Sequence, residues 1–258
     1  MMKMQDKPNH RVVRTPLRRA VSWLYRNAAR RKSSITPLWM PPVEARKITP
    51  ASPLSDVFYA HNGRPINKWT HYLHRYDQHF DRFRGSAVRM LEIGVFEGGS
   101  LELWRKYLGP DARIFGIDID PACAGKVDDP NQVRIGSQDD PAFLESVVKE
   151  MGGVDLVLDD GSHRGHHIMT SFRTLFPLLS DGGLYVIEDM HDDFAEFPGT
   201  RRNQSLAFLK SLIDDMHSHY SGLAPLESSD VGGIHLFDSI VFIEKQTSKP
   251  IANTIVPF

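Results

Sequence analysis

The sequence contains little cysteine and no long hydrophobic run. Its single cysteine, Cys123, excludes an intramolecular disulfide and a zinc site built from thiolates, and this scarcity is typical of a reducing compartment. No apolar stretch approaches the roughly 18 residues that a membrane-spanning helix requires. The formal charge of −1 shows no overall excess of positive charge that would favour nucleic acid as a partner. We therefore expect a soluble, cytoplasmic protein that does not bind nucleic acid.

The first 53 residues differ in composition from the rest. Residues 10–32 carry eight Arg or Lys and no acid, and apolar residues recur there at helical spacing. This pattern predicts a basic amphipathic helix, which is either a contact surface for an anionic membrane or a partner subunit, or a poorly ordered tail. Prolines between residues 37 and 53 predict an extended linker. We therefore assign residues 1–53 to a basic arm with its linker and residues 54–258 to one folded domain, and we expect a homo-oligomer.

The stretch that organises the folded domain is RMLEIGVFEGGS, residues 89–100. A short apolar run ends in a glycine-bearing loop, and the helical sequence LELWRKYL follows. This is the strand, tight turn and helix start that open a nucleotide site in a doubly wound α/β domain. The carboxylates of Glu92 and Glu97 would repel a pyrophosphate but attract the cationic S-adenosylmethionine. The candidate cofactor-binding residues in this stretch are Glu92, Gly94, Gly98 and Ser100.

Two further strand ends complete the expected cofactor site. Asp118 ends an apolar run 20 residues after Gly98, where a carboxylate can accept both ribose hydroxyls, with Asp120 as the second choice. A third run, residues 132–135, is followed by Gln138, at the strand end that reaches the adenine edge. The residues around Gln138 fit the start of a helix equally well.

Two later apolar runs end in carboxylates. The run VDLVLDDGSH contains Asp160, and the run GGLYVIED ends in Glu188 and Asp189. Parallel strands release their carboxyl ends at one edge of a sheet, so we expect these three acids to gather there. Such a set of carboxylates favours Mg²⁺, which would also relieve their mutual repulsion. Capping and turn formation are the alternative use of these acids.

Histidines follow the first of these acids at short range. His163 lies three residues after Asp160, and histidine is the side chain best suited to act as a general base at neutral pH. His163 is therefore the candidate catalytic residue, and His166, His167 and His191 compete for the role.

An aromatic segment precedes the organising stretch. The sequence KWTHYLHRYDQHFDRF, residues 68–83, places aromatic residues at roughly helical spacing and predicts a helix packed on the sheet. Its polar members, Lys68 and His71, are candidates for a lid over the cofactor pocket.

Four motifs together carry a family resemblance. The sequences LEIGVFEGGSLELWRKYL, GIDID, LVLDDGSH and GGLYVIEDMH resemble the class I S-adenosylmethionine-dependent methyltransferases, in particular the metal-dependent sugar O-methyltransferases. A related group named for cephalosporin hydroxylase shares the pattern. The resemblance covers residues 67–191 and resumes at 234–245. It implies a Rossmann-like, doubly wound seven-stranded sheet with the order 3-2-1-4-5-7-6 and an antiparallel seventh strand.

The resemblance also implies roles for residues of this sequence. It implies that Asp160, Glu188 and Asp189 bind magnesium, that His163 is the base, and that the cofactor contacts include Glu92, Gly94 and Asp118.

The expected reaction is magnesium-dependent transfer of a methyl group from S-adenosylmethionine to a hydroxyl of a sugar or another vicinal diol, since two adjacent hydroxyls suit two metal positions. Two alternatives stay open. One is a catechol-like or antibiotic-pathway small-molecule O-methyltransferase, and the other is a non-catalytic cofactor-binding accessory protein. Residues 194–226, which include Arg201 and Arg202, are the expected substrate-facing insertion.

Overall fold

The computed structural model describes residues 41–129, 132–191, 204–247 and 254. The chain forms two compact units, residues 1–45 and 46–258. The basic helix predicted within residues 10–32 lies outside the described residues.

Part of the predicted linker is helical. Helix α2 (Pro42–Ile48) and helix α3 (Pro53–Tyr59) both begin at a proline. The prediction of an extended chain is therefore wrong for residues 42–48. Proline is compatible with the first turn of a helix, because the N–H that it lacks has no intrahelical acceptor there. Ser52 caps α3 by accepting a hydrogen bond from the backbone of Ser55. The division into residues 1–53 and 54–258 stays a prediction.

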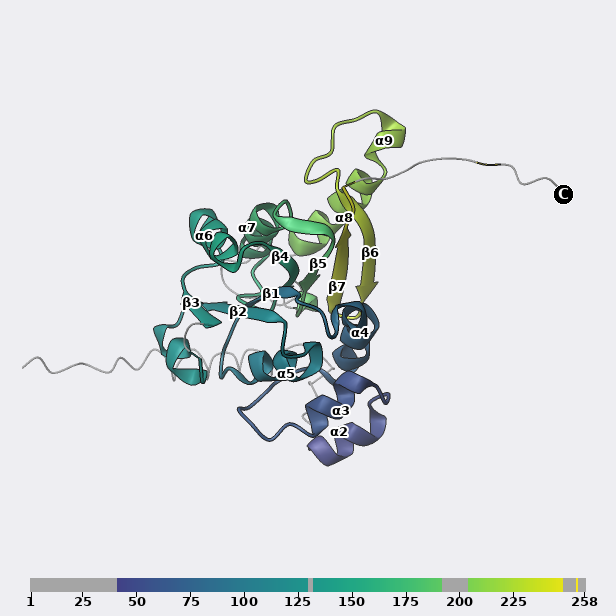
Figure 1. The fold of residues 1–258 in the computed structure, drawn as a ribbon. Helices are drawn as coiled ribbons and strands as arrows, with labels where there is room; N and C mark the ends of the chain where they lie inside the picture. The colour runs from purple at the N-terminus through teal and green to yellow at the C-terminus, as the bar shows by residue number, and fades with distance from the viewer. Residues whose placement is uncertain (1–40, 130–131, 192–203, 248–253, 255–258) are drawn as a thin grey trace, which may run out of the picture. The chain divides into compact units, whose positions relative to one another are not determined.

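A seven-stranded sheet forms the centre of the second unit (Figure 1). Its order is β3-β2-β1-β4-β5-β7-β6; β7 is antiparallel to both of its neighbours, and the other pairs are parallel. This confirms the predicted doubly wound α/β fold and its strand order. The strands are β1 (Arg89–Ile93), β2 (Arg113–Asp118), β3 (Val133–Ile135), β4 (Val154–Asp159), β5 (Leu179–Ile187), β6 (Val231–Phe237) and β7 (Ile240–Lys245).

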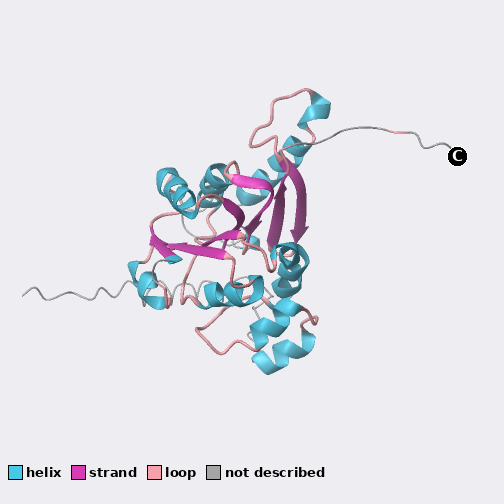
Figure 2. Cartoon of the chain, viewed as in Figure 1, coloured by secondary structure: helices cyan, strands magenta, loops and turns pink. Residues whose placement is uncertain are grey.

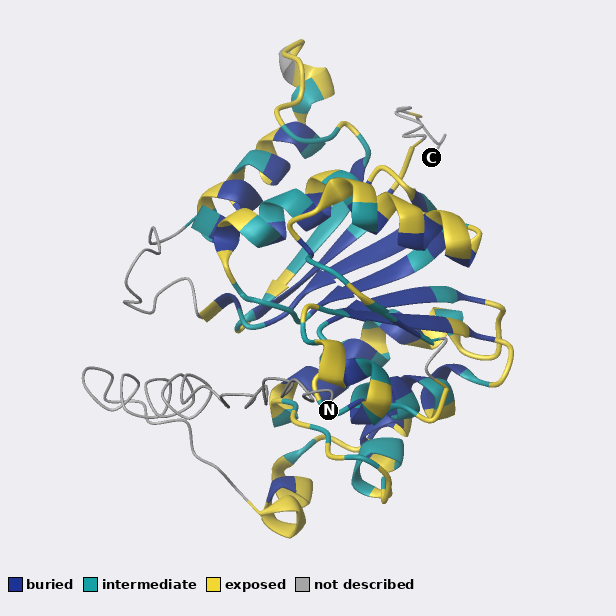
Figure 3. Ribbon diagram, turned by 90° about the vertical axis from the view of Figure 1, so that its left-hand side faces the viewer, coloured by how far each residue is buried: buried dark blue, intermediate teal, exposed yellow. Residues whose placement is uncertain are grey.

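Helices cover both faces of the sheet (Figure 2), and the buried strands lie between them (Figure 3). One face packs on α3, α4 (Thr70–Phe80) and α5 (Gly99–Leu108), and the other on three later helices. None of the described helices is long and apolar enough to span a membrane. The remaining elements are α6 (Pro141–Met151), α7 (Gly165–Leu175), α8 (Gln204–Met216), α9 (Ser218–Ser221) and the 3₁₀ turns η1 (Asp81–Phe83) and η2 (Pro121–Lys126).

The continuous apolar runs follow from burial on both faces. In β4, Leu156 and Leu158 belong to the core beneath α4 and α5, whereas Val157 belongs to the opposite core. Because alternate side chains of a strand point to opposite faces, a strand covered on both sides needs apolar residues at every position. The aromatic stripe of residues 68–83 also packs as predicted, since Tyr72, Tyr76 and Phe80 of α4 are fully buried.

The expected substrate-facing insertion is in part a core helix. Within residues 194–226, α8 buries Phe208, Leu209 and Leu212 against the sheet. The prediction is therefore wrong for this helix, because its apolar face serves packing. Arg201 and Arg202 lie outside the described residues.

A partly buried ion pair joins β1 to β4. Arg89 donates to the carboxylate of Asp155 from its backbone N at 2.9 Å, Nε at 2.8 Å and Nη2 at 2.6 Å, and Ser180 Oγ lies 2.6 Å from the same carboxylate. Burial alone would raise the pKa of Asp155, but hydrogen bonds from Arg89 and Ser180 outweigh it and lower the pKa to about 2.

The Asp155→Asn variant is expected to lower the free energy of unfolding by about 2 kcal/mol at pH 7. Because the folded pKa lies below the unfolded value, the carboxylate stabilises the fold fully above about pH 4 and loses that contribution as the pH falls towards 2. Urea unfolding of both proteins at pH 7 and pH 3 measures this. An equal difference at the two pH values would contradict the assignment.

Candidate active site

Three predicted site residues meet at the carboxyl ends of β4 and β5. Asp160 follows β4 directly, and Asp189 lies two residues after β5. His163 Nε2 lies 3.9 Å from Asp160 Oδ1 and 4.0 Å from Asp189 Oδ2, and all three side chains are about one-fifth exposed. One ligand atom from each lies within 4.8 Å of the others. The structure therefore brings the candidate base together with two of the three predicted metal ligands.

The backbone at this meeting point is unusual. His163 has φ 56° and Asp189 has φ 54°, a left-handed conformation that side chains other than glycine seldom adopt. Residues held in such conformations concentrate at functional sites, where the surrounding structure fixes them against their strain. Tyr72 on α4 supplies part of that support, because its hydroxyl lies 2.9 Å from Asp189 Oδ1 and 3.0 Å from the carbonyl oxygen of Ser239.

Lys68, predicted from the sequence only as a candidate lid, is a member of the site. Its Nζ lies 2.6 Å from both Asp160 Oδ2 and Glu188 Oε1, and its side chain is 2% exposed. Burial alone would lower the pKa of Lys68, but attraction to Asp160, Glu188 and Glu92 outweighs it and raises the pKa above its usual range. Burial, together with repulsion from Asp160, also raises the pKa of Glu188.

This contact changes two predictions. Lys68 is not placed as a lid, because its buried ammonium is held between two acids. Glu188, the third predicted metal ligand, is fully buried against Lys68 and lies outside the group formed by Asp160, His163 and Asp189. His71 contacts the carbonyl oxygen of Asp238 at 3.1 Å and is exposed.

The loop after β1 needs glycine for contacts within the chain. Gly94 has φ +99°, and a Cβ there would lie 2.2 Å from the carbonyl oxygen of Asp160. Gly98 has φ +84°, and a Cβ there would lie 2.6 Å from the carbonyl oxygen of Lys126. These two glycines therefore let the loop pack directly on the segments that follow β4 and β2, and the first of them places the loop beside the acids.

Most of the predicted cofactor residues form hydrogen bonds or close contacts within the chain. Glu92 is fully buried; it accepts hydrogen bonds from Ser100 Oγ at 2.9 Å and Trp104 Nε1 at 3.2 Å. Burial raises its pKa to about 7, against the opposing effect of Lys68. Asp118 accepts from the backbone N–H groups of Val95, Phe96 and Asp120. Its carboxylate thus shapes the loop after β1.

Gln138 and Asp120 have clear structural partners. Gln138 donates to Asp159 Oδ1 at 3.0 Å and accepts from the backbone N–H of Ser162 at 2.8 Å, so both ends of its amide brace the turn after β4. Asp120, the second choice for the ribose, caps η2 by accepting from Ala122. Asp159 points inward and is 2% exposed, and it is bound also by Ser171 and Tyr185.

The competing histidines lie around the site. His191 Nδ1 lies 2.5 Å from Ser239 Oγ and 3.9 Å from Asp189 Oδ1. His167 Nδ1 lies 2.7 Å from Ser162 Oγ, and His166 is exposed on α7. Of the four candidates, His163 faces both Asp160 and Asp189.

The Lys68→Met variant is expected to lower the free energy of unfolding by about 3 kcal/mol, because it leaves the buried carboxylate of Glu188 and the partly exposed one of Asp160 without their cation. Urea unfolding in EDTA measures the effect without a metal ion that could replace the ammonium. The matched control is Lys126→Met, since Lys126 Nζ lies 2.8 Å from Glu97 but both side chains are partly exposed. The control is expected to stay within about 1 kcal/mol of the parent protein, and equal losses in the two variants would contradict the role of Lys68.

Comparison with known proteins identifies the family and the fold of this domain. Residues 91–190 match a family model described as "Methyltransferase domain". The structure is similar to that of MycE methyltransferase from the mycinamycin biosynthetic pathway in complex with Mg and SAH, with a TM-score of 0.61 and 33% identity over 75% of this chain and 53% of that one. The chain carries a class I S-adenosylmethionine-dependent methyltransferase domain. This confirms the family that the four motifs resemble.

Curated relatives of the methyltransferase domain are O-methyltransferases by name. One is the 8-demethyl-8-(2-methoxy-alpha-L-rhamnosyl)-tetracenomycin-C 3'-O-methyltransferase of Streptomyces olivaceus, 38% identical over 69% of this chain and 50% of the relative. Another is the mycinamicin VI 2''-O-methyltransferase of Micromonospora griseorubida, 38% identical over 66% of this chain and 47% of the relative. The chain thus spans about half the length of these relatives.

Proposed function

We propose that the methyltransferase domain transfers a methyl group from S-adenosylmethionine to a hydroxyl of a sugar or glycosylated metabolite, with Mg²⁺ beside the acceptor. The meeting of Asp160, His163 and Asp189 next to the loop after β1 carries this proposal. The relatives support the acceptor class, since one is named for a rhamnosyl group and another for the 2''-oxygen of mycinamicin VI. A MycE structure that contains Mg, SAH and mycinamycin VI supports the cofactors, at 34% identity over 75% of this chain.

The donor set suits a hard cation. Asp160 keeps Oδ1 and Asp189 keeps Oδ2 on the side of His163, while their other oxygens contact Lys68 and Tyr72. Carboxylate oxygens are the ligands that Mg²⁺ prefers in proteins. Glu188, the third predicted ligand, is buried and contacts Lys68 through Oε1. We therefore propose Asp160 and Asp189 as the metal ligands.

S-adenosylmethionine belongs at the neighbouring strand ends. In doubly wound sheets, ligands bind outside the carboxyl ends of the strands near the point where the strand order reverses, which here lies between β1 and β4. The loop after β1 and Asp118 lie at that edge, and Glu92 lies beneath the loop. Acids on this side favour a cationic donor over a phosphate-bearing one.

The chemistry assigned to the chain is positioning and proton transfer. When bound, Mg²⁺ would orient the acceptor hydroxyl and stabilise the negative charge that develops on its oxygen. His163 accepts the proton of that hydroxyl as the oxygen forms its bond to the methyl carbon and the bond from carbon to sulfur breaks. Lys68 and Tyr72 hold the carboxylates of Asp160 and Asp189 in place during this transfer.

Methyl transfer to a panel of rhamnosides and catechols, with Mg²⁺ or with EDTA, tests the proposal. S-adenosylmethionine binding is measured separately by isothermal titration. We expect binding of the donor, methylation of a rhamnoside in Mg²⁺ and none in EDTA. Methylation of catechols alone would overturn the acceptor class, and donor binding without transfer to any acceptor would favour an accessory protein. Full activity in EDTA would overturn the metal assignment.

A further inference from the structure

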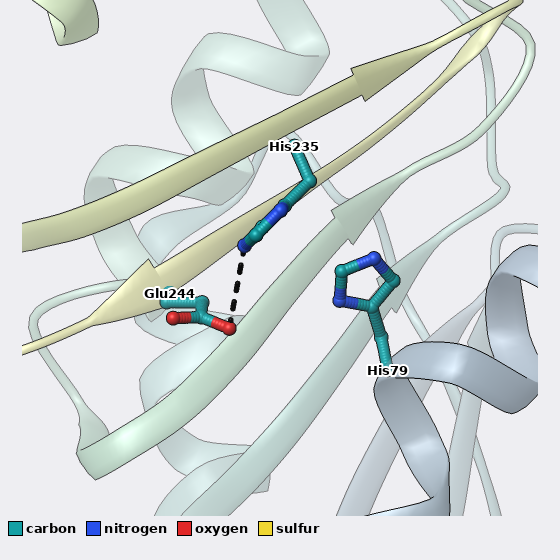
Figure 4. A group of neighbouring side chains, drawn as sticks. All are labelled: His79, His235 and Glu244. Carbon is teal, nitrogen blue, oxygen red and sulfur yellow. Dashed lines mark ion pairs between the residues drawn. The ribbon is translucent and has the colours of Figure 1, made fainter.

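A second group of metal-ligating side chains lies at the edge of the sheet, away from the acids at the strand ends. His79 is in the last turn of α4, His235 is on the edge strand β6, and Glu244 is on β7. The two strands are antiparallel, with Gly233 opposite Glu244 and His235 opposite Phe242. Alternate residues of a strand share a face, so His235 and Glu244 project from the face of the hairpin on which α4 packs (Figure 4).

The three side chains face one another closely. His235 Nε2 lies 3.5 Å from Glu244 Oε1, the rings of His79 and His235 have centroids 4.6 Å apart, and one ligand atom from each residue lies within 4.8 Å of the others (Figure 4). A Zn²⁺ ion with bonds of about 2.0–2.1 Å separates tetrahedral ligand atoms by about 3.4 Å. Small side-chain rotations would therefore bring these atoms to ligand distance.

Two neighbouring residues, Phe242 and Gly233, determine how the three side chains are held and how closely the backbone approaches them. His79 stacks on Phe242 with ring centroids 4.2 Å apart and an interplanar angle of 18°, which fixes the plane of its imidazole. Gly233 has no side chain next to the group; a Cβ there would lie only 3.4 Å from Glu244 Oε2 and 3.7 Å from His235 Nε2.

We propose that His79, His235 and Glu244 form a binding site for Zn²⁺ or a similar transition-metal ion. Two imidazoles and one carboxylate are a donor set that binds such ions with a fourth position left to water. The same set distinguishes this site from the acids at the strand ends, because imidazole nitrogen favours zinc whereas Mg²⁺ prefers oxygen ligands.

The position of the site predicts that bound Zn²⁺ stabilises the fold. The ion would tie the last turn of α4 to both strands of the β6–β7 hairpin. The same helix contacts Asp189 through Tyr72 near its other end. Binding of Zn²⁺ is therefore expected to raise the thermal stability of the whole chain.

Isothermal titration of the full chain with ZnCl₂, in buffer containing millimolar MgCl₂, tests the site. The variants are His235→Ala, which alters a partly exposed side chain, and Glu244→Gln, which keeps the shape of the carboxylate. We expect one Zn²⁺ to bind the parent protein and affinity to fall in both variants by more than about 10–100-fold, the effect of losing even an outer-shell partner. Thermal unfolding should shift upward with Zn²⁺ in the parent protein and not in His235→Ala.

Two controls separate this site from an isolated exposed histidine and from the acids at the strand ends. His219→Ala removes an exposed histidine of α9 and is expected to bind Zn²⁺ like the parent protein. Asp189→Asn is expected to retain the ion as well, because it alters only the acids at the strand ends. Binding lost in Asp189→Asn but kept in His235→Ala would overturn the proposal. Absence of Zn²⁺ binding by the parent protein in MgCl₂ would also overturn it.

Discussion

Asparagine in place of Asp189 is expected to reduce Mg²⁺-stimulated methyl transfer to the level that remains in EDTA. The substitution keeps the size of the side chain and replaces a charged oxygen ligand with a neutral amide, which binds Mg²⁺ poorly. Asparagine also tolerates the left-handed backbone found at residue 189, so the local conformation should survive. Initial rates measured over a range of MgCl₂ concentrations report the loss, and circular dichroism reports the fold.

The matched control is Asp181→Asn. Asp181 lies near the other end of β5 and accepts hydrogen bonds from Thr247, so its loss should leave the rate and its dependence on MgCl₂ unchanged. Asp189→Asn with the rate and MgCl₂ dependence of the parent protein would show that Asp189 is not a ligand.

Alanine in place of His163 is expected to lower kcat by about 10²–10⁴-fold, the usual contribution of a positioned general base. Affinity for S-adenosylmethionine should change little, because we assign this side chain to the acceptor hydroxyl. Single-turnover rates and isothermal titration separate the two quantities. A kcat equal to that of the parent protein would transfer the role to another group.

The control for this prediction is His166→Ala. His166 is exposed on α7, and its loss should leave kcat unchanged. If kcat instead falls in His166→Ala and survives in His163→Ala, the base is His166.

The sequence predicts those parts of the fold that depend on local patterns of apolar and polar residues. The apolar runs before Asp160 and Glu188 predict strands buried on both faces, and the strand ends then place the acids at one edge of the sheet. The strand order itself came from the resemblance of four motifs, and the structure confirms it.

Tertiary contacts account for what the sequence did not predict. Lys68 precedes Asp160 by 92 residues and Glu188 by 120, and no local pattern links a lysine at the start of an aromatic helix to acids so distant. The buried position of Glu188 follows from that same contact. A lysine two residues before an aromatic helix was the available signal.

Hydrogen bonding between neighbouring loops explains the differences around the cofactor residues. The motif glycines were predicted to admit a ligand, yet a Cβ at Gly94 would first meet the backbone of Asp160. Gln138 likewise braces Asp159 and Ser162. A sequence motif shows which residue is needed at a position. It does not show whether that residue contacts a ligand or another loop of the chain.

The shared hydroxyl of Tyr72 has a consequence for engineering this protein. The hydroxyl of Tyr72 contacts both Asp189 and the backbone of Ser239 in the β6–β7 turn, and Met190 donates to the same carbonyl oxygen. The hairpin at the edge of the sheet therefore supports an acid that follows the neighbouring strand, β5. A shift of one residue in the pairing of β6 with β7 would move the side chains of the hairpin to the opposite face. The contact between Tyr72 and the backbone of Ser239 would then be lost. Insertions, tags or loop exchanges near residue 239 are therefore expected to lower the rate of methyl transfer by displacing Asp189.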